Sequence, residues 1–73
     1  MLYSRKEATI EHLRILNLHG LPFFDIYYKY TDELDPKTQL ARVQGEMVSS
    51  GIQVGDRVLV EKIARTVMRV EKL

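Results

Sequence analysis

Residues 21–31, LPFFDIYYKYT, are dense in aromatic and β-favouring side chains and alternate with a period of two, which is typical of a β-strand. Successive side chains of a strand point to opposite faces of the sheet. The more apolar face carries Phe24, Ile26, Tyr28 and Tyr30. The other face carries Phe23, Asp25, Tyr27 and Lys29. We therefore predict a strand whose first face is buried.

Residues 4–18 fit two descriptions. Ser4 and Glu7 have the spacing of a capping box, and Gly20 is a residue that commonly ends a helix. The apolar side chains, however, project onto nearly every side of a helical wheel, whereas a surface helix carries one apolar stripe. The alternative is a strand over residues 9–18 that turns at Gly20 into the next segment as a long hairpin. Helix and strand both remain open at this point.

The remaining chain reads as further strands separated by turn-forming segments. DELDPK is a polar loop, and residues 38–48, TQLARVQGEMV, predict a third strand with a bend or a bulge at Gly45. Residues 58–63 and 66–70 predict a C-terminal hairpin. A flat sheet of short strands would leave long edges and uncovered apolar surface. We expect a mainly β fold, a small antiparallel sheet or partly open barrel of four to five strands, with or without one N-terminal helix.

The length of 73 residues predicts a single small domain, residues 1–73. A chain this short buries only about 60% of the surface that its unfolded form exposes. It has no cysteine, so no disulfide supplements the core, and the reducing cytoplasm is the expected location, that of the host if the chain is viral. No apolar run approaches the length of a membrane span, and the N-terminus lacks the apolar stretch of a signal peptide. We expect no membrane association.

The charge is balanced overall but unevenly distributed. The formal net charge is +1, which argues against a protein that wraps duplex DNA through many Lys and Arg contacts. Residues 1–36 carry four basic and six acidic side chains, a balance of −2, whereas residues 37–73 carry seven basic and four acidic, a balance of +3. The C-terminal half is therefore the mildly cationic one, although differences of this size also arise by chance.

The sequence contains no pattern typical of catalysis. The serines lack a nucleophile-elbow context, and neither a Walker pattern nor a dinucleotide glycine pattern is present. His12 and His19 are seven residues apart, a spacing that assigns them no zinc site, and the acidic turn at residues 32–35 lacks the ligand order of a calcium loop. We expect no enzymatic activity, no catalytic residue, no cofactor and no metal.

The C-terminal half resembles five-stranded oligonucleotide-binding folds of the S1 type, such as bacterial translation initiation factor one. The resemblance runs over about 30 residues, from ARVQGEM through VGDRVLVEK to VMRVEKL, and includes a glycine at a strand end and a Gly-Asp turn before the next strand. It implies a small barrel that engages single-stranded RNA or DNA.

Aromatic and basic side chains supply the candidate binding residues. Aromatic side chains on a strand can stack bases while Lys and Arg follow the phosphates. Tyr, Phe and Arg are also enriched as anchors of protein interfaces. The candidate partner-binding residues are Phe23, Tyr27, Lys29, Arg42, Arg57 and Arg69. The core is the alternative location for the aromatic side chains, because a small domain without disulfides needs them there.

The functional prediction is a small, non-catalytic, protein-binding regulator of gene expression. In size and make-up the chain resembles the short phage-encoded proteins that bind host RNA polymerase and modulate or inhibit transcription. This resemblance rests on no motif and assigns no residue a role. The alternative is the oligonucleotide-binding module. The charge distribution argues against it, because the aromatic strand lies in the acidic half of the chain. A third alternative is a subunit that self-associates through an exposed strand edge.

Overall fold

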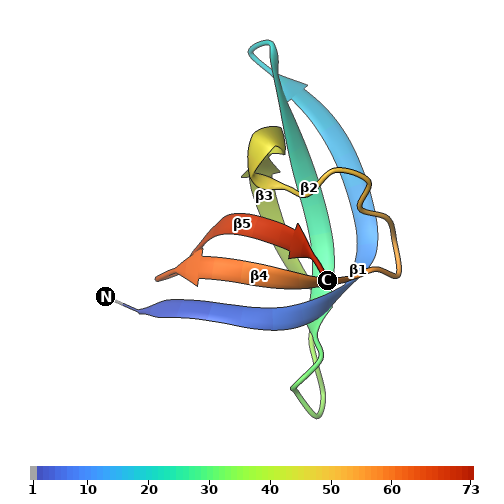
Figure 1. Ribbon diagram of the computed structural model, residues 1–73, viewed down its shortest axis with the longest axis vertical. Helices are drawn as coiled ribbons and strands as arrows, with labels where there is room; N and C mark the ends of the chain where they lie inside the picture. The colour runs from blue at the N-terminus through green and yellow to red at the C-terminus, as the bar shows by residue number, and fades with distance from the viewer. Residues whose placement is uncertain (1) are drawn as a thin grey trace.

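The protein folds into five strands and one short 3-10 helix in the computed structural model, which describes residues 2–73 (Figure 1). The elements are β1 (Tyr3–Leu18), β2 (Leu21–Tyr30), β3 (Gln39–Gln44), η1 (Gly45–Met47), β4 (Arg57–Ile63) and β5 (Thr66–Lys72). The prediction of a mainly β fold is confirmed. The N-terminal helix, one of the two alternatives, is wrong, because residues 4–18 lie within β1.

All five strands belong to one antiparallel sheet with the order β3-β2-β1-β4-β5. The long central strand β1 serves two partners, since residues 3–9 pair with β4 and residues 8–18 pair with β2. Figure 1 shows β1 bending between these two parts, from a course beside β4 to a course along β2. The bend curls the sheet, so that β3 and β5, the two ends of the strand order, contact each other.

The curled sheet is joined at one end by a short stretch of chain after η1. Val48 forms a parallel bridge with Val70 of β5, and the Ser49 amide donates a 3.0 Å hydrogen bond to the Val70 carbonyl. No strand ladder between β3 and β5 extends this bridge within residues 2–73, so the sheet stays open over the rest of that seam.

A β-bulge in β1 explains why its sequence gave conflicting signals. The pairing of β1 with β2 shifts register between Ile10 and His12 and leaves Glu11 without a partner in that ladder. An extra residue moves the following side chains to the opposite face. Ala8 and Ile10 face the core before the bulge, whereas Leu13 packs against it afterwards. The inward positions therefore break the period of two, and the apolar residues project onto all sides of a wheel.

The β1–β2 hairpin closes through a two-residue turn. His19 and Gly20 both have positive φ angles, 53° and 80°. Two-residue turns of type I′ require positive φ at both central positions, because this twist matches that of the flanking strands. The turn sets the register of the whole hairpin, with Leu18 opposite Leu21.

The core lies on the concave face of the curled sheet. Its fully buried side chains come from four strands and include Ile10, Ile26, Tyr28, Val58, Val60 and Val70. Of the β2 face that the alternation predicts to be buried, Ile26, Tyr28 and Tyr30 are buried, and Phe24 is half-buried against the core. The Tyr28 and Tyr30 rings pack edge to face, with centroids 5.3 Å apart.

The predicted segments agree with the structure except at their ends. The third strand was expected over residues 38–48, but β3 stops at Gln44, and Gly45 begins η1 instead of a bend in the strand. A side chain at Gly45 would come within 3.3 Å of the Pro22 carbonyl oxygen, so the glycine permits this close approach to β2. The predicted C-terminal hairpin is confirmed. Over residues 2–73 no helix has the length and apolar character needed to cross a membrane.

Candidate functional site

Three adjacent strands present a group of aromatic and charged side chains on the convex side of the sheet. Alternation places these residues opposite the core, since their neighbours Ile26 and Tyr28 point inward. We call this group the outer face and define it by His12, Arg14 and Leu16 of β1, Phe23, Asp25, Tyr27 and Lys29 of β2, and Leu40, Arg42 and Gln44 of β3. The register aligns most of them in rows across the strands.

The middle row of the outer face holds Asp25 between two arginines. Asp25 lies opposite Arg14 on one side and opposite Arg42 on the other. The Asp25 side chain is almost fully buried, with 4% of the residue exposed. Arg42 donates to both of its oxygens, from Nε to Oδ1 at 2.8 Å and from Nη2 to Oδ2 at 3.1 Å. This bidentate geometry satisfies the carboxylate and fixes the plane of the guanidinium.

The ion pair also sets the protonation of both groups. The hydrogen bonds from Arg42 lower the pKa of Asp25, against the opposing effect of burial, and the charge of nearby Arg14 lowers it further. The same contact raises the pKa of Arg42. Both groups are therefore charged at neutral pH, and the pair as a whole is neutral. Arg14 supplies the remaining positive charge of this row, and within residues 2–73 it forms no ion pair.

Aromatic side chains lie on either side of the middle row. Tyr27 lies opposite His12 of β1, and the two rings are 5.4 Å apart at a tilt of 52°. On its other side Tyr27 faces Leu40, whose side chain is exposed. Phe23 lies four residues from Tyr27 on the same strand, a separation of about 13 Å at a rise of ~3.3 Å per residue. Two half-buried aromatic side chains thus flank the Asp25–Arg42 pair.

Four of the six predicted partner-binding residues meet on this face, namely Phe23, Tyr27, Lys29 and Arg42. Lys29 forms an ion pair with Glu11, at 3.4 Å. The other two predicted residues lie on strands outside the three that form the outer face. Arg57 of β4 is two strands from Lys29, with Thr9 between them, and pairs with Glu7 at 3.4 Å. Arg69 lies on β5 and pairs with Glu71 at 3.4 Å.

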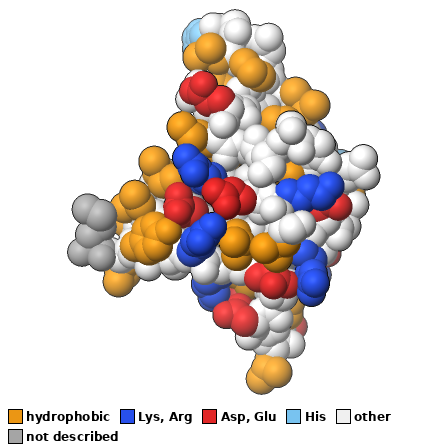
Figure 2. Space-filling view, viewed as in Figure 1, with side chains coloured by type: hydrophobic (Ala, Val, Ile, Leu, Met, Phe, Trp, Pro, Cys, Tyr) orange, Lys and Arg blue, Asp and Glu red, His pale blue; other side chains and the backbone are white. Residues whose placement is uncertain are grey.

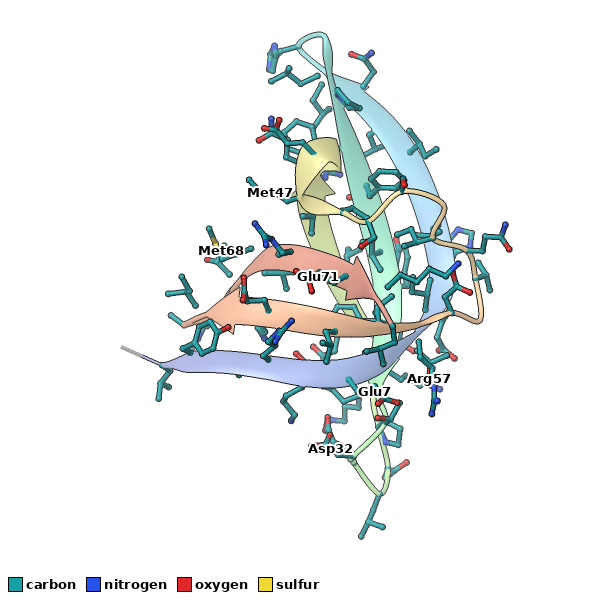
Figure 3. The ribbon with its side chains drawn as sticks, viewed as in Figure 1. Glu7, Asp32, Met47, Arg57, Met68 and Glu71 are labelled. Atoms are coloured by element: carbon teal, nitrogen blue, oxygen red, sulfur yellow. The ribbon has the colours of Figure 1, made fainter. Side chains whose placement is uncertain are left out.

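The surface formed by β4, β5 and the first part of β1 has a different character from the outer face. Its arginines and glutamates alternate and neutralise one another, as the adjacent blue and red side chains in Figure 2 show. Glu71, labelled in Figure 3, accepts from both Arg5 and Arg69, while Glu7 faces Arg57. Exposed ion pairs of this kind contribute little to stability, about 0–1 kcal/mol each.

His12 and Arg14 belong to the outer face but were not among the predicted residues. The two-residue turn fixes their position. In the hairpin that it closes, the residue numbers of each pair between the bulge and the turn add up to 39, as for Leu18 opposite Leu21, so His12 lies opposite Tyr27. The same sum places Arg14 opposite Asp25. The sequence supports this hairpin only as one of two alternatives, so it does not predict the register.

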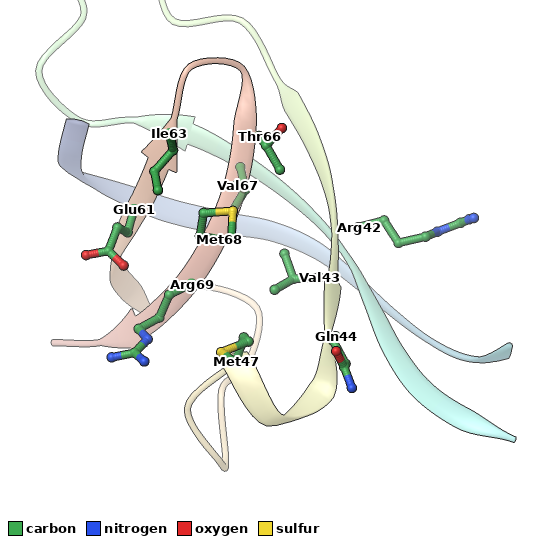
Figure 4. Close-up of a pocket in the computed structure, with 10 residues that line it drawn as sticks. All are labelled: Arg42, Val43, Gln44, Met47, Glu61, Ile63, Thr66, Val67, Met68 and Arg69. Atoms are coloured by element: carbon green, nitrogen blue, oxygen red, sulfur yellow. The ribbon is translucent and has the colours of Figure 1, made fainter. Parts of the chain in front are cut away.

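A groove lies along the open part of the seam between β3 and β5 (Figure 4). Its volume is about 470 Å³. Its lining is largely apolar, with Val43, Met47, Ile63, Val67 and Met68 prominent, and with Arg42, Gln44, Glu61, Thr66 and Arg69 at its margins. The side chains of Met47 and Met68 are partly exposed at its mouth, and Figure 4 shows Arg42 directed away from it. The groove and the outer face therefore adjoin along β3, and Arg42 and Gln44 lie at the border between them.

Three of the polar residues considered for catalysis or metal binding lie in a turn or against a neighbouring residue. The Ser49 hydroxyl accepts a 3.0 Å hydrogen bond from the Lys72 amide, as expected of a turn residue. His19 forms the hairpin turn, and His12 lies against Tyr27. Over the part of the chain that the structure describes, no three His, Asp or Glu side chains are grouped as metal ligands.

Comparison of the chain with protein-family models, with curated proteins and with solved structures finds no match.

Proposed function

We propose that this chain is an oligonucleotide-binding module that engages single-stranded RNA or DNA across the outer face. The observation that carries the proposal is the pair of aromatic side chains, Phe23 and Tyr27, with Arg14 and Arg42 between them. Aromatic rings on strands stack bases without regard to sequence, and arginines beside them contact the backbone.

The strand arrangement supports the same proposal. Oligonucleotide-binding folds are five-stranded, partly open barrels that bind ligands on the face of their second and third strands and on the loops at its ends. The order β3-β2-β1-β4-β5, with β3 and β5 in contact, corresponds to such a barrel. Of the segments that resemble the S1 type, ARVQGEM spans β3 and η1, and VGDRVLVEK spans the turn into β4.

The charge of the outer face predicts how binding depends on salt. Its cations are Arg14, Lys29 and Arg42, of which two are paired with carboxylates. About one phosphate contact, at Arg14, is then expected, and the logarithm of the binding constant should fall with the logarithm of salt concentration with a slope of about −0.7. Stacking therefore supplies most of the affinity, and charge supplies the smaller part.

The test is fluorescence anisotropy with labelled 12-nucleotide RNA and DNA single strands. Removal of one stacking ring costs about 1–3 kcal/mol, so Tyr27→Ala should weaken binding about 5- to 150-fold. Tyr3→Ala is the matched control, because Tyr3 is an exposed tyrosine of β1 opposite β4, away from the outer face. Equal effects of both substitutions, or no binding by the unmodified protein at millimolar concentration, would contradict the proposal.

A protein-binding regulator is the second candidate function, and the groove between β3 and β5 favours it. Both strands end the sheet order and have an unpaired edge beside the groove. An extended peptide that adds to such an edge gains backbone hydrogen bonds, and its apolar side chain would contact Met47 and Met68, whose flexible side chains adapt to varied partners. That the partner is RNA polymerase stays a prediction.

An affinity pull-down from bacterial lysate, with and without nuclease, distinguishes the two candidate functions. RNA polymerase retained after nuclease by the unmodified protein, and lost on Met68→Lys, would establish the regulator. The regulator would be contradicted if RNA polymerase were retained only while nucleic acid is intact. In that case Tyr27→Ala should abolish the retention and Met68→Lys should not.

A further inference from the structure

The guanidinium of Arg42 is held in a fixed plane with one of its two donor edges already occupied. Nε and Nη2 donate to Asp25 along the side edge of the group. The end edge, formed by Nη1 and the second hydrogen of Nη2, is left to face other acceptors. About half of the Arg42 side chain is exposed, 53%, although its partner carboxylate is buried. The free edge is therefore accessible to a ligand and already oriented.

Arg42 lies one diagonal step from Tyr27. Tyr27 pairs with Leu40, and Arg42 is two residues further along β3, a separation of about 7–8 Å. Long side chains interact across this distance. The proximity of the two groups also contributes to the raised pKa of Arg42. A base stacked on Tyr27 would thus extend one edge toward the guanidinium.

We propose that Tyr27 and Arg42 form a guanine-selective subsite within the single-strand path, an inference that rests on the proposed function. Guanine presents two acceptors side by side, O6 and N7, and the paired donors of an arginine match them. Adenine presents an amino donor beside N7, so it leaves a donor of Arg42 facing a donor. Uracil offers a single acceptor on the corresponding edge.

A base edge suits Arg42 better than a phosphate because Asp25 cancels its charge. A phosphate is attracted mainly by net positive charge, whereas a neutral base needs oriented donors. The Asp25–Arg42 pair keeps the donors and removes the net charge. Arg14, without an ion pair among residues 2–73, remains the cation for the backbone. Asp25 acts as a positioning residue, because it contacts the guanidinium and not the base.

The experiment compares 12-nucleotide oligouridylates that differ at one central base, by fluorescence anisotropy on the intact protein. A central guanine should strengthen binding about 5- to 150-fold over uracil or adenine. A central 7-deazaguanine, which lacks the N7 acceptor, should lose most of that gain. This comparison needs no protein variant, so it holds even if substitutions at Arg42 impair folding.

Two variants test whether the paired donors of Arg42 cause the selectivity. Arg42→Lys keeps a positive charge beside Asp25 but loses the paired donors, so it should bind guanine-containing and all-uracil strands alike, with all-uracil affinity within about twofold of the unmodified protein. Asp25→Asn should reduce the guanine-to-uracil ratio, a change that a purely structural role would not produce. Arg57→Lys, the matched control on β4, should leave the ratio unchanged.

The outcomes distinguish this inference from the function on which it rests. All-uracil strands bound without a guanine preference, or equal weakening of every strand by Arg42→Lys, would overturn the guanine subsite and leave the binding module in place. Failure to bind any of the strands would overturn both.

Discussion

Replacing Arg42 with methionine tests the ion pair whose carboxylate is the most buried among those of residues 2–73. The substitution keeps much of the apolar stem of the side chain but removes both hydrogen bonds to Asp25. Asp25 is then a carboxylate with 4% of its surface exposed and without its main partner. We expect Arg42→Met to destabilise the fold strongly at neutral pH.

The magnitude follows from the geometry of the pair. Removing one partner of a fully buried ion pair costs about 3–5 kcal/mol. Half of the Arg42 side chain is in water, and Arg14 stays beside Asp25, so a loss of about 2–3 kcal/mol is expected. A domain of 73 residues has a total stability of roughly 4–11 kcal/mol, so the variant stays folded. Its Tm should fall by about 10–20 °C.

Acidic pH should reduce the difference in the free energy of unfolding between the unmodified protein and Arg42→Met. The pKa of Asp25 is lowered in the folded protein, so the pair's stabilisation is present above the unfolded pKa of about 4 and is lost as the pH falls through the folded pKa. In Arg42→Met, burial without the main partner acts in the opposite direction and favours the protonated carboxyl group. The free energies of unfolding of the two proteins should therefore converge below pH 4.

Urea denaturation at pH 7 and at pH 3.5 measures both effects. Arg57→Met is the matched control, since the pair of Arg57 with Glu7 is solvent-exposed and its loss should cost no more than about 0.5 kcal/mol. The reasoning is refuted if the two substitutions cost the same at pH 7, or if the cost of Arg42→Met does not change with pH.

Three further predictions concern the core, the turn and alkaline pH. Ile26→Ala should lower the free energy of unfolding in urea by about 2–5 kcal/mol because Ile26 is 0% exposed. Ile15→Ala, at a position that is 73% exposed, should change it by no more than about 0.5 kcal/mol. Similar losses in both variants would place the core elsewhere. Gly20→Ala should lower stability by about 1 kcal/mol, since its φ is 80°, and an unchanged Tm would mean that the turn relaxes. Burial and the hydrogen bond with Tyr30 raise the pKa of Tyr28, so the contribution of Tyr28 to stability should be constant below pH 10 and fall above it. A loss of stability above pH 10 that is unaltered in Tyr28→Phe would show that Tyr28 is not its cause.

The fold could be predicted where local patterns and tertiary packing agree. In β2 the period of two, the aromatic content and the burial all coincide, and the predicted inward face is the observed one. In β1 they conflict, because the bulge at Glu11 shifts the alternation and the strand pairs with β4 in one half and with β2 in the other. Nothing local in residues 4–18 encodes that exchange of partners, so helix and strand were equally supported.

The candidate site was predictable only within a single strand. Alternation alone places Phe23, Tyr27 and Lys29 together, and Arg42 follows from the β2–β3 register. The position of Arg57, two strands away, depends on the order of strands, which no motif in the sequence specifies. The burial of Asp25 was also unforeseen, since it arises from a cross-strand arginine and not from its own hydrophobicity.

The central claim is that single-stranded nucleic acid binds across the outer face. The most direct test follows the backbone amide signals of the isotopically labelled protein by NMR while a 12-nucleotide single strand is added. The account predicts that the largest shifts map to the outer face, at His12, Arg14, Phe23, Tyr27 and Arg42. Shifts confined to the groove at Met47 and Met68, or no shifts at all, would contradict it.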